Sequence, residues 1–340
     1  MNAFYGCSCI PGNFTPTQAI FWIARNFYGN DWTDLQGDLD VQRFGNGDPT
    51  LFFNPQYGAL SGWSTIGNSY YNGMSLSLRQ RTHGLQWDFN YTFSHSLDDS
   101  SGLQTDTGFG GASFILNPIR QHDWYANSDF DIRHVINVNA VFELPMGRGK
   151  WIAKNAGHGL NALIGGFQLS SIFRWSTGLP LSAPFDDARW ATNWNVQSRT
   201  VLTQPLATCV TKGDTNTAPK LFGCNPKAAY QSFRNAYPGE SGQRNIFRVP
   251  GVLRLDSGLS KSFSLPWSEK QSLQLRWEIF NVTNTQHFGP MDLSRSGYGL
   301  RLDPAVRNLT PPTNWSNFTD IQGGSTDGRR EMQVGVRFSF

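Results

Sequence analysis

Apolar and polar residues alternate in a series of stretches along this chain, and each stretch is long enough to form a β-strand. The clearest is 85–95, where an almost wholly aromatic set alternates with polar residues. A period of two places the two sets on opposite sides of a strand. The alternation predicts strands over 70–79, 85–95, 132–144, 167–175, 252–263, 272–280 and 331–340.

The closing stretch, 331–340, has five large apolar residues on one face: Met332, Val334, Val336, Phe338 and Phe340. Its other face is Gln333, Gly335, Arg337 and Ser339. A strand between lipid and a wet lumen has this pattern. A strand packed on the core of a soluble protein has it too. The stretch by itself therefore leaves both readings open.

The connections between the predicted strands are alternately short and long. Short turns are expected at 80–84 and 264–271, and another begins at 145–151, before a stretch that is compatible with a short helix. The irregular stretches 96–131, 177–250 and 281–330 are long. Antiparallel strands collect all the short connections at one end, as in outer-membrane barrels with periplasmic turns and extracellular loops.

The charged residues of the predicted strands occupy the same alternate positions as the other polar residues, so they lie on the polar face of each strand. In lipid each would cost about 2–4 kcal/mol at the midplane, so the segregation favours a membrane wall with a polar lumen. Soluble half-buried sheets have the same parity, but strand length, aromatic content and unequal connections favour the barrel. The residues predicted to face the lumen are Arg254, Asp256, Arg276, Glu278 and Arg337, together with Arg79 and Asp88.

Composition agrees with one large β domain rather than several average domains. Of 340 residues, 16% are charged and 14% aromatic, and 35 are glycine. No apolar run of about 18 residues occurs, which excludes a transmembrane helix. The net charge of +3 is scattered, so we expect no binding to nucleic acid. The first residues lack the basic and apolar regions of a signal peptide, which a protein outside the cytoplasm needs.

The four cysteines do not have the spacing of a zinc site. Cys209 and Cys224 flank a polar stretch and form a candidate disulfide, with two unpaired thiols as the alternative. Closing a loop of about 15 residues would contribute roughly 3 kcal/mol. A disulfide would require an oxidising compartment.

The chain carries no arrangement of residues that is typical of an enzyme. A nucleophile elbow, a metalloprotease helix and a phosphate loop are all missing from the sequence. We therefore expect no catalytic residues, no cofactor and no metal. Asp98, Asp99 and Asp106 could supply oxygen ligands to calcium, although a solvated acidic loop is favoured over that reading. His122 with Asp123, or His287, would be weaker candidates.

Seven segments in order resemble the C-terminal part of TonB-dependent outer-membrane receptors. The resemblance is to the Oar-like type, which carries a carboxypeptidase-regulatory-like N-terminal domain. The segments are YYNGMSLSLRQR, NYTFSHSLDDSSG, SDFDIRHVINVNAVFELPMG, GGFQLSSIFRWSTGLPLS, RNIFRVPGVLRLDSGLSKSF, LRWEIFNVTNTQHFG and MQVGVRFSF.

The resemblance implies an all-β fold, the antiparallel wall of a transmembrane β-barrel. The family's barrel is expected to have about 22 strands, of which this chain would supply about eight to ten. Members also have a signal peptide, a β-sandwich domain and a plug domain, so the chain is expected to be a fragment. We assign 70–340 to the barrel and 1–69 to an irregular loop region on the extracellular side with short strands at most.

The resemblance also implies a function: part of a receptor that imports a bulky substrate across the outer membrane. Its partners would be outer-membrane lipid, the barrel-assembly machinery and, through the missing plug domain, the TonB system. The assembly machinery would recognise the closing strand at Phe340 and Phe338. Two alternatives stay open: a passive pore or surface adhesin on a similar barrel, and a secreted β-sandwich that binds glycans.

Overall fold

The computed structural model describes most of the chain from residue 65 onward. The described ranges are 65–82, 84–101, 120–184, 199–213, 218–234, 240–265, 268–288, 315–318 and 329–339, with Gln18, Ile115, Ala236 and Pro311 as single residues. The loop region predicted over 1–69 lies almost wholly outside the described residues, as does Phe340.

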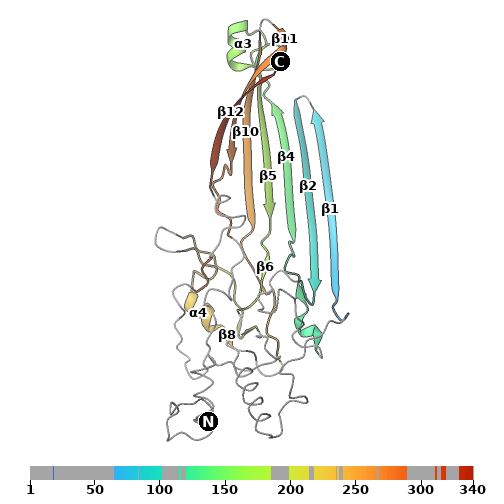
Figure 1. The fold of residues 1–340 in the computed structure, drawn as a ribbon, viewed down its shortest axis with the longest axis vertical. Coiled ribbons are helices and arrows are strands. Elements are labelled where there is room, and N and C mark those ends of the chain that lie inside the picture. Colours follow the sequence, from blue (N-terminus) through green and yellow to red (C-terminus); the bar gives the residue numbers. More distant parts are fainter. Residues whose placement is uncertain are drawn as a thin grey trace, which may run out of the picture.

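The described part of the chain is organised around one antiparallel sheet of long strands (Figure 1). Its order is β1-β2-β4-β5-β10-β11-β12, and the short strand β3 also pairs with β2. β1 and β12 are the edges and are not paired with each other, so the sheet is open. The bounds are β1 (Ser69–Thr82), β2 (Leu85–Asp98), β3 (Ala126–Asn127), β4 (His134–Glu143), β5 (Phe167–Ser176), β10 (Val252–Leu265), β11 (Ser268–Phe280) and β12 (Glu331–Ser339).

Two of the predicted turns are shorter than the sequence pattern indicated. Only 83–84 separate β1 from β2, and only 266–267 separate β10 from β11. The predicted turns 80–84 and 264–271 were too long because polar residues at the strand ends hide the alternation. The ladder nevertheless continues there, for example where Arg81 is paired with Gln86 and Thr82 with Leu85. Backbone pairing does not require apolar side chains.

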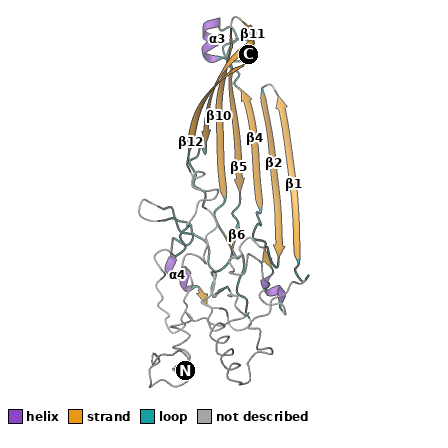
Figure 2. Ribbon diagram, viewed as in Figure 1, coloured by secondary structure: helices purple, strands orange, loops and turns teal. Residues whose placement is uncertain are grey.

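The connections lie as the sequence pattern predicted (Figure 2). The β1–β2, β4–β5 and β10–β11 connections meet at one end of the sheet, and the three long ones meet at the other. The β4–β5 connection, 144–166, contains the helix α3 (His158–Ile164). The all-β antiparallel sheet with unequal connections is thus confirmed. No helix among the described residues is both long and apolar enough to cross a membrane.

The long connections form a packed body at their end of the sheet. We call the described residues 177–184, 199–213, 218–234, 240–250 and 315–318 the loop body. Its core includes Leu221, Phe222, Phe247 and Trp315, whose indole stacks on Phe222 with ring centroids 5.5 Å apart. The elements are β6 (Pro180–Leu181), β7 (Val201–Leu202), α4 (Pro226–Gln231), β8 (Phe233–Arg234) and β9 (Phe247–Arg248), and the 3-10 helix η1 (Gln121–Trp124) lies in the β2–β4 connection.

Candidate functional site

One face of the sheet is apolar across all of its long strands. Cross-strand pairing sets equivalent side chains in rows, because residues opposite each other point to the same side. No second sheet packs on this face among the described residues, and Val334 is 76% exposed. Such a surface is suited to lipid. One row across five strands is Leu76, Tyr91, Ile136, Trp175 and Leu253.

Aromatic rings mark both ends of this apolar face. Near the loop body, His134 lies between rings, with centroids 5.1 Å from Phe93 and 6.4 Å from Trp175. At the other end of β5 is Phe167. The eight steps along the strand from Phe167 to Trp175 span roughly 26 Å. In outer-membrane barrels, tilted strands cross an apolar band that lies between two aromatic girdles.

The opposite face carries the polar residues, many in contact along or across strands. Arg254 Nε lies 3.0 Å from Asp256 Oδ2, and Arg276 Nη2 lies 2.7 Å from Glu278 Oε1. The register places Gln333 opposite Glu278, and its amide donates to the Glu278 carboxylate. Arg337 is opposite Gln274 on the same face. The register also connects Arg79 and Asp88 to this face, so all seven residues predicted to face the lumen share one face of the sheet.

Of the two aromatic residues that close the sequence, only Phe338 lies among the described residues. Phe338 is opposite Leu273 on the apolar face and is half exposed. Phe340 lies outside the described residues. Their recognition by the assembly machinery stays a prediction.

The loop body is attached to the sheet by buried ion pairs that we call the arginine clasp: Arg244, Asn245 and Arg248 with Asp98, Asp129 and Asp131. The side chain of Arg244 is 5% exposed and contacts Asp98 Oδ1 at 2.5 Å and Asp129 Oδ1 at 3.3 Å. Asn245 Nδ2 donates to Asp129 Oδ1 at 2.8 Å and to the Asn127 carbonyl at 2.6 Å.

Asp131 is the second centre of the clasp, and its side chain is fully buried. It accepts from the Ser96 backbone N–H at 2.7 Å, from Arg133 Nε at 3.1 Å and from Arg248. Burial raises the pKa of Asp131, but the hydrogen bonds from Ser96, Arg248 and His95 and the charge of Arg248 outweigh burial and lower its pKa overall. The carboxylate is therefore held ionised.

The clasp was missed by sequence reasoning, and it changes the reading of the acidic loop. Asp98 and Asp99 were considered as calcium ligands or as solvated residues, yet both are buried. Asp98 is paired with Arg244, and Asp99 accepts from the Asn68 backbone N–H at 2.8 Å. Asp106 lies outside the described residues. The available signal was the opposite charge of two quoted segments, SDFDIRH and RNIFRVPG.

The other candidate groups form no evident chemical site. Cys209 and Cys224 are joined by a disulfide, with Cα atoms 5.8 Å apart. Asp123 on η1 pairs with Arg120, which precedes the helix, and His287 is buried. Within the described ranges, no group of three or more His, Cys, Asp or Glu side chains is placed to hold a metal ion.

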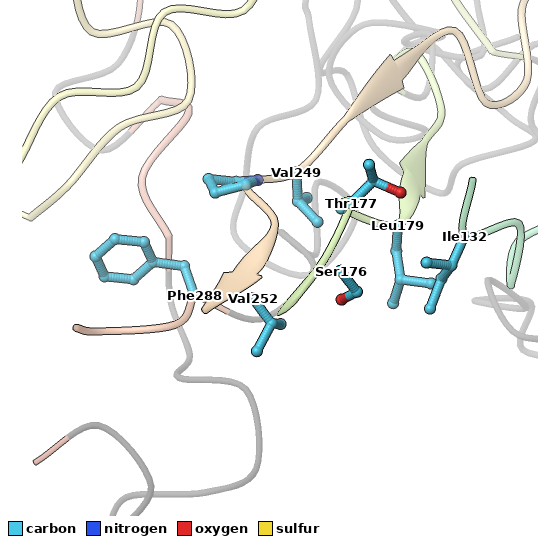
Figure 3. Close-up of a pocket in the computed structure, with 9 residues that line it drawn as sticks. Ile132, Ser176, Thr177, Leu179, Val249, Val252 and Phe288 are labelled. Carbon is cyan, nitrogen blue, oxygen red and sulfur yellow. The ribbon is translucent and has the colours of Figure 1, made fainter. Parts of the chain in front are cut away.

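A small cavity lies where the sheet meets the loop body (Figure 3). Its volume is about 20 Å³, which is room for one water molecule. The lining is mostly apolar and includes Ile132, Leu179, Val249, Val252 and Phe288. A bulky ligand does not fit in this cavity.

Comparison with known families gives a match. A family model described as an outer membrane beta barrel domain matches residues 24–333. No curated protein and no solved structure matches the chain.

Proposed function

Because the chain belongs to the outer membrane beta barrel domain family, we propose that it is part of a TonB-dependent outer-membrane receptor that imports a bulky substrate. Family membership and the two-faced antiparallel sheet confirm the predicted fold class, the wall of a transmembrane β-barrel. The chain is accordingly an outer-membrane protein. Import, dependence on TonB and the Oar-like type go further and are our proposal.

The observation that carries the proposal is the ordered loop body. Its core is packed and it is fixed by the arginine clasp to the end of β2 and to the residues before β4. A receptor requires a structured outer surface that presents the same groups to every substrate molecule. A passive pore has no such requirement. The seven ordered segments that resemble Oar-like receptors support the same reading.

In this proposal the chain supplies the barrel wall and the outer surface, and the energy for import is delivered to another part of the receptor. The TonB system would act through a plug domain, as in the family that the chain resembles. The charges on the polar face, such as Arg254, Asp256 and Arg276, would line the lumen in contact with water. The barrel-assembly machinery would recognise β12 together with Phe338 and Phe340.

The alternative functions assign different roles to the sheet. A secreted glycan-binding sandwich would need a second sheet over the apolar face, and the described strands form one sheet there. A passive pore or an adhesin would use the same wall without energy coupling. The family match favours neither of these two over import.

Uptake of labelled solutes tests the proposal. Cells that carry the gene and cells that lack it would be given a panel of bulky solutes, such as ferric chelates, oligosaccharides and peptides, with and without a protonophore. We expect at least one solute whose uptake requires both the gene and the proton gradient. Uptake that requires the gene but survives the protonophore would instead establish a passive pore. Adhesion without uptake would establish an adhesin.

A further inference from the structure

The β4–β5 connection, 144–166, lies at the short-connection end of the sheet (Figure 1). It carries several large apolar side chains that are exposed. Trp151 is 87% exposed and Leu163 is 72% exposed. Ile152 and Leu160 are also exposed. Exposed apolar groups that gather on one segment usually mark a surface that contacts a partner or a membrane.

The exposure does not come from a lack of local order. The backbone N–H of Gly147 donates to the Ile152 carbonyl at 2.9 Å, and that of Ile152 donates to the Pro145 carbonyl at 2.8 Å. Asn161 Oδ1 accepts from the Arg148 backbone N–H at 2.7 Å and ties the first turn to α3. The connection is thus held by its own hydrogen bonds, and its large apolar groups lie outside.

Lys261 joins the connection to the lipid-facing side of the sheet. Its partners in the register are Phe167 and Leu275, so it lies on the apolar face. Its ammonium donates to the Leu163 carbonyl and lies 4.2 Å from the Phe167 ring centroid and 5.0 Å from that of Phe263. The end of α3 therefore sits at the aromatic boundary of the apolar face. Aromatic and basic groups favour this depth in membranes.

The charge of the connection is entirely basic. Arg148, Lys150 and Lys154 are exposed, and the stretch 144–166 contains no Asp or Glu. Glu143, just before it, pairs with Lys150 at 3.3 Å in an exposed contact. Basic residues beside aromatic and aliphatic ones are typical of segments that lie in the interface of a membrane with anionic lipids.

We propose that the β4–β5 connection is an interfacial anchor on the periplasmic side of the outer membrane. Trp151, Leu160 and Leu163 insert at the boundary between headgroups and acyl chains, and Arg148, Lys150 and Lys154 bind anionic phospholipid headgroups. The anchor follows from the membrane wall itself and does not depend on import.

Photocrosslinking to lipid tests the anchor. The full chain would be reconstituted in vesicles of phosphatidylcholine and phosphatidylglycerol in equal amounts, with p-benzoylphenylalanine in place of Trp151 or, in a second protein, of Leu163. The control position is Val210, which is exposed in the loop body. Mass spectrometry after irradiation identifies the attached lipid. We expect lipid adducts at 151 and 163, absent at 210, with phosphatidylglycerol in excess.

Variants that remove lysine charges distinguish binding of anionic headgroups from contact with any lipid. Lys150→Gln with Lys154→Gln should lower the ratio of phosphatidylglycerol to phosphatidylcholine adducts by about 5-fold or more, since each lysine near the surface contributes about 1 kcal/mol. The matched pair Lys212→Gln with Lys227→Gln, exposed on the loop body, should leave the ratio unchanged. No lipid adduct at 151 or 163 in inserted protein would overturn the anchor. Adducts in the same lipid ratio for all variants would overturn headgroup binding.

Discussion

At the scale of single residues, adjacent positions on β12 face different solvents. Val334 points to the apolar side opposite Trp277, whereas Gln333 points to the polar side and donates to Glu278. The two positions have the same backbone and nearly the same depth. They differ only in the medium that surrounds the side chain, so they make a matched pair for substitution.

Val334→Arg should impair assembly in the outer membrane, and Gln333→Arg should be tolerated. An arginine on the lipid face costs about 2–4 kcal/mol near the midplane and less toward the interface, while one beside Glu278 gains a partner. Outer-membrane levels and the heat-dependent shift in gel mobility would measure assembly. Leu275→Arg and Gln274→Arg form a second such pair on β11. Equal damage within both pairs would contradict the assigned faces.

Asp131→Asn should weaken the attachment of the loop body. The substitution removes the carboxylate that pairs with Arg248 and Arg133, and breaking a buried pair typically costs about 3–5 kcal/mol. Hydrogen exchange of 241–250 would report the loss. Asp123→Asn serves as the control, because its pair with Arg120 is exposed and such pairs contribute at most about 1 kcal/mol.

The lowered pKa of Asp131 predicts that the attachment of the loop body depends on pH. Because folding lowers the pKa of Asp131, its contribution to stability is complete above the ordinary carboxyl pKa of about 4 and is lost as the pH falls through the lowered value. The protection of 241–250 against exchange, corrected for the pH dependence of intrinsic amide exchange, should therefore fall below about pH 4 in the wild type, and Asp131→Asn should show a smaller fall. An identical pH profile for both proteins would refute this assignment.

At the scale of elements, the disulfide closes a loop that the backbone already holds. Cys209 N donates to the Leu221 carbonyl and Gly223 N to the Cys209 carbonyl, each at 2.9 Å. The cystine spans 15 residues, for which the loop-entropy model gives about 3 kcal/mol. Since the backbone contacts remain after reduction, the loop body should loosen rather than unfold.

Cys209→Ser combined with Cys224→Ser should lower the stability of the loop body by up to about 3 kcal/mol and leave the strands paired. Limited proteolysis within 199–234 would reveal the loosened loop body, and the gel-mobility shift would report on the sheet. Val210→Ser changes an exposed residue between the two cysteines and should have no effect on either measurement. Loss of the gel-mobility shift in the cysteine variant would show that the sheet depends on the disulfide.

The strands could be predicted from sequence because alternation is local, whereas the clasp could not. Each residue of β2 or β11 reveals its face through its neighbours two positions away. Asp98 shows no such sign: its environment is set by Arg244, which lies 146 residues along the chain in an irregular connection. The sequence pattern therefore predicts which face of the sheet carries Arg254 and Glu278. The burial of Asp98, Asp129 and Asp131 depends on how the long connections fold, which the pattern does not show.

At the scale of the whole molecule, the sheet has two free edges. β1 and β12 each have one neighbour among the described strands. Unpaired edges expose backbone donors and acceptors that cannot be satisfied in lipid. We therefore expect further strands to pair with β1 and β12, as in a barrel wider than the described sheet.

Paired cysteines would test the open sheet. In a background with Cys7 and Cys9 replaced by serine, Ser77→Cys would be combined in turn with Gln333→Cys, Gly335→Cys or Arg337→Cys. We expect no crosslink between β1 and β12. Ser77→Cys with Asn90→Cys is the control that should crosslink, because those residues are opposite each other on β1 and β2. A crosslink from β1 to β12 would mean that the described strands close on themselves.

The arginine clasp also has a consequence for the order of events during membrane insertion. Its basic residues come from the β5–β10 connection and its acidic residues from β2 and the β2–β4 connection. Both groups lie at the long-connection end of the sheet, which we expect to face the outside of the cell, so both connections would have to be translocated before any of these ion pairs can form. Formation of the clasp would then be a late step, and burial of Asp131 would mark molecules in which both connections have crossed.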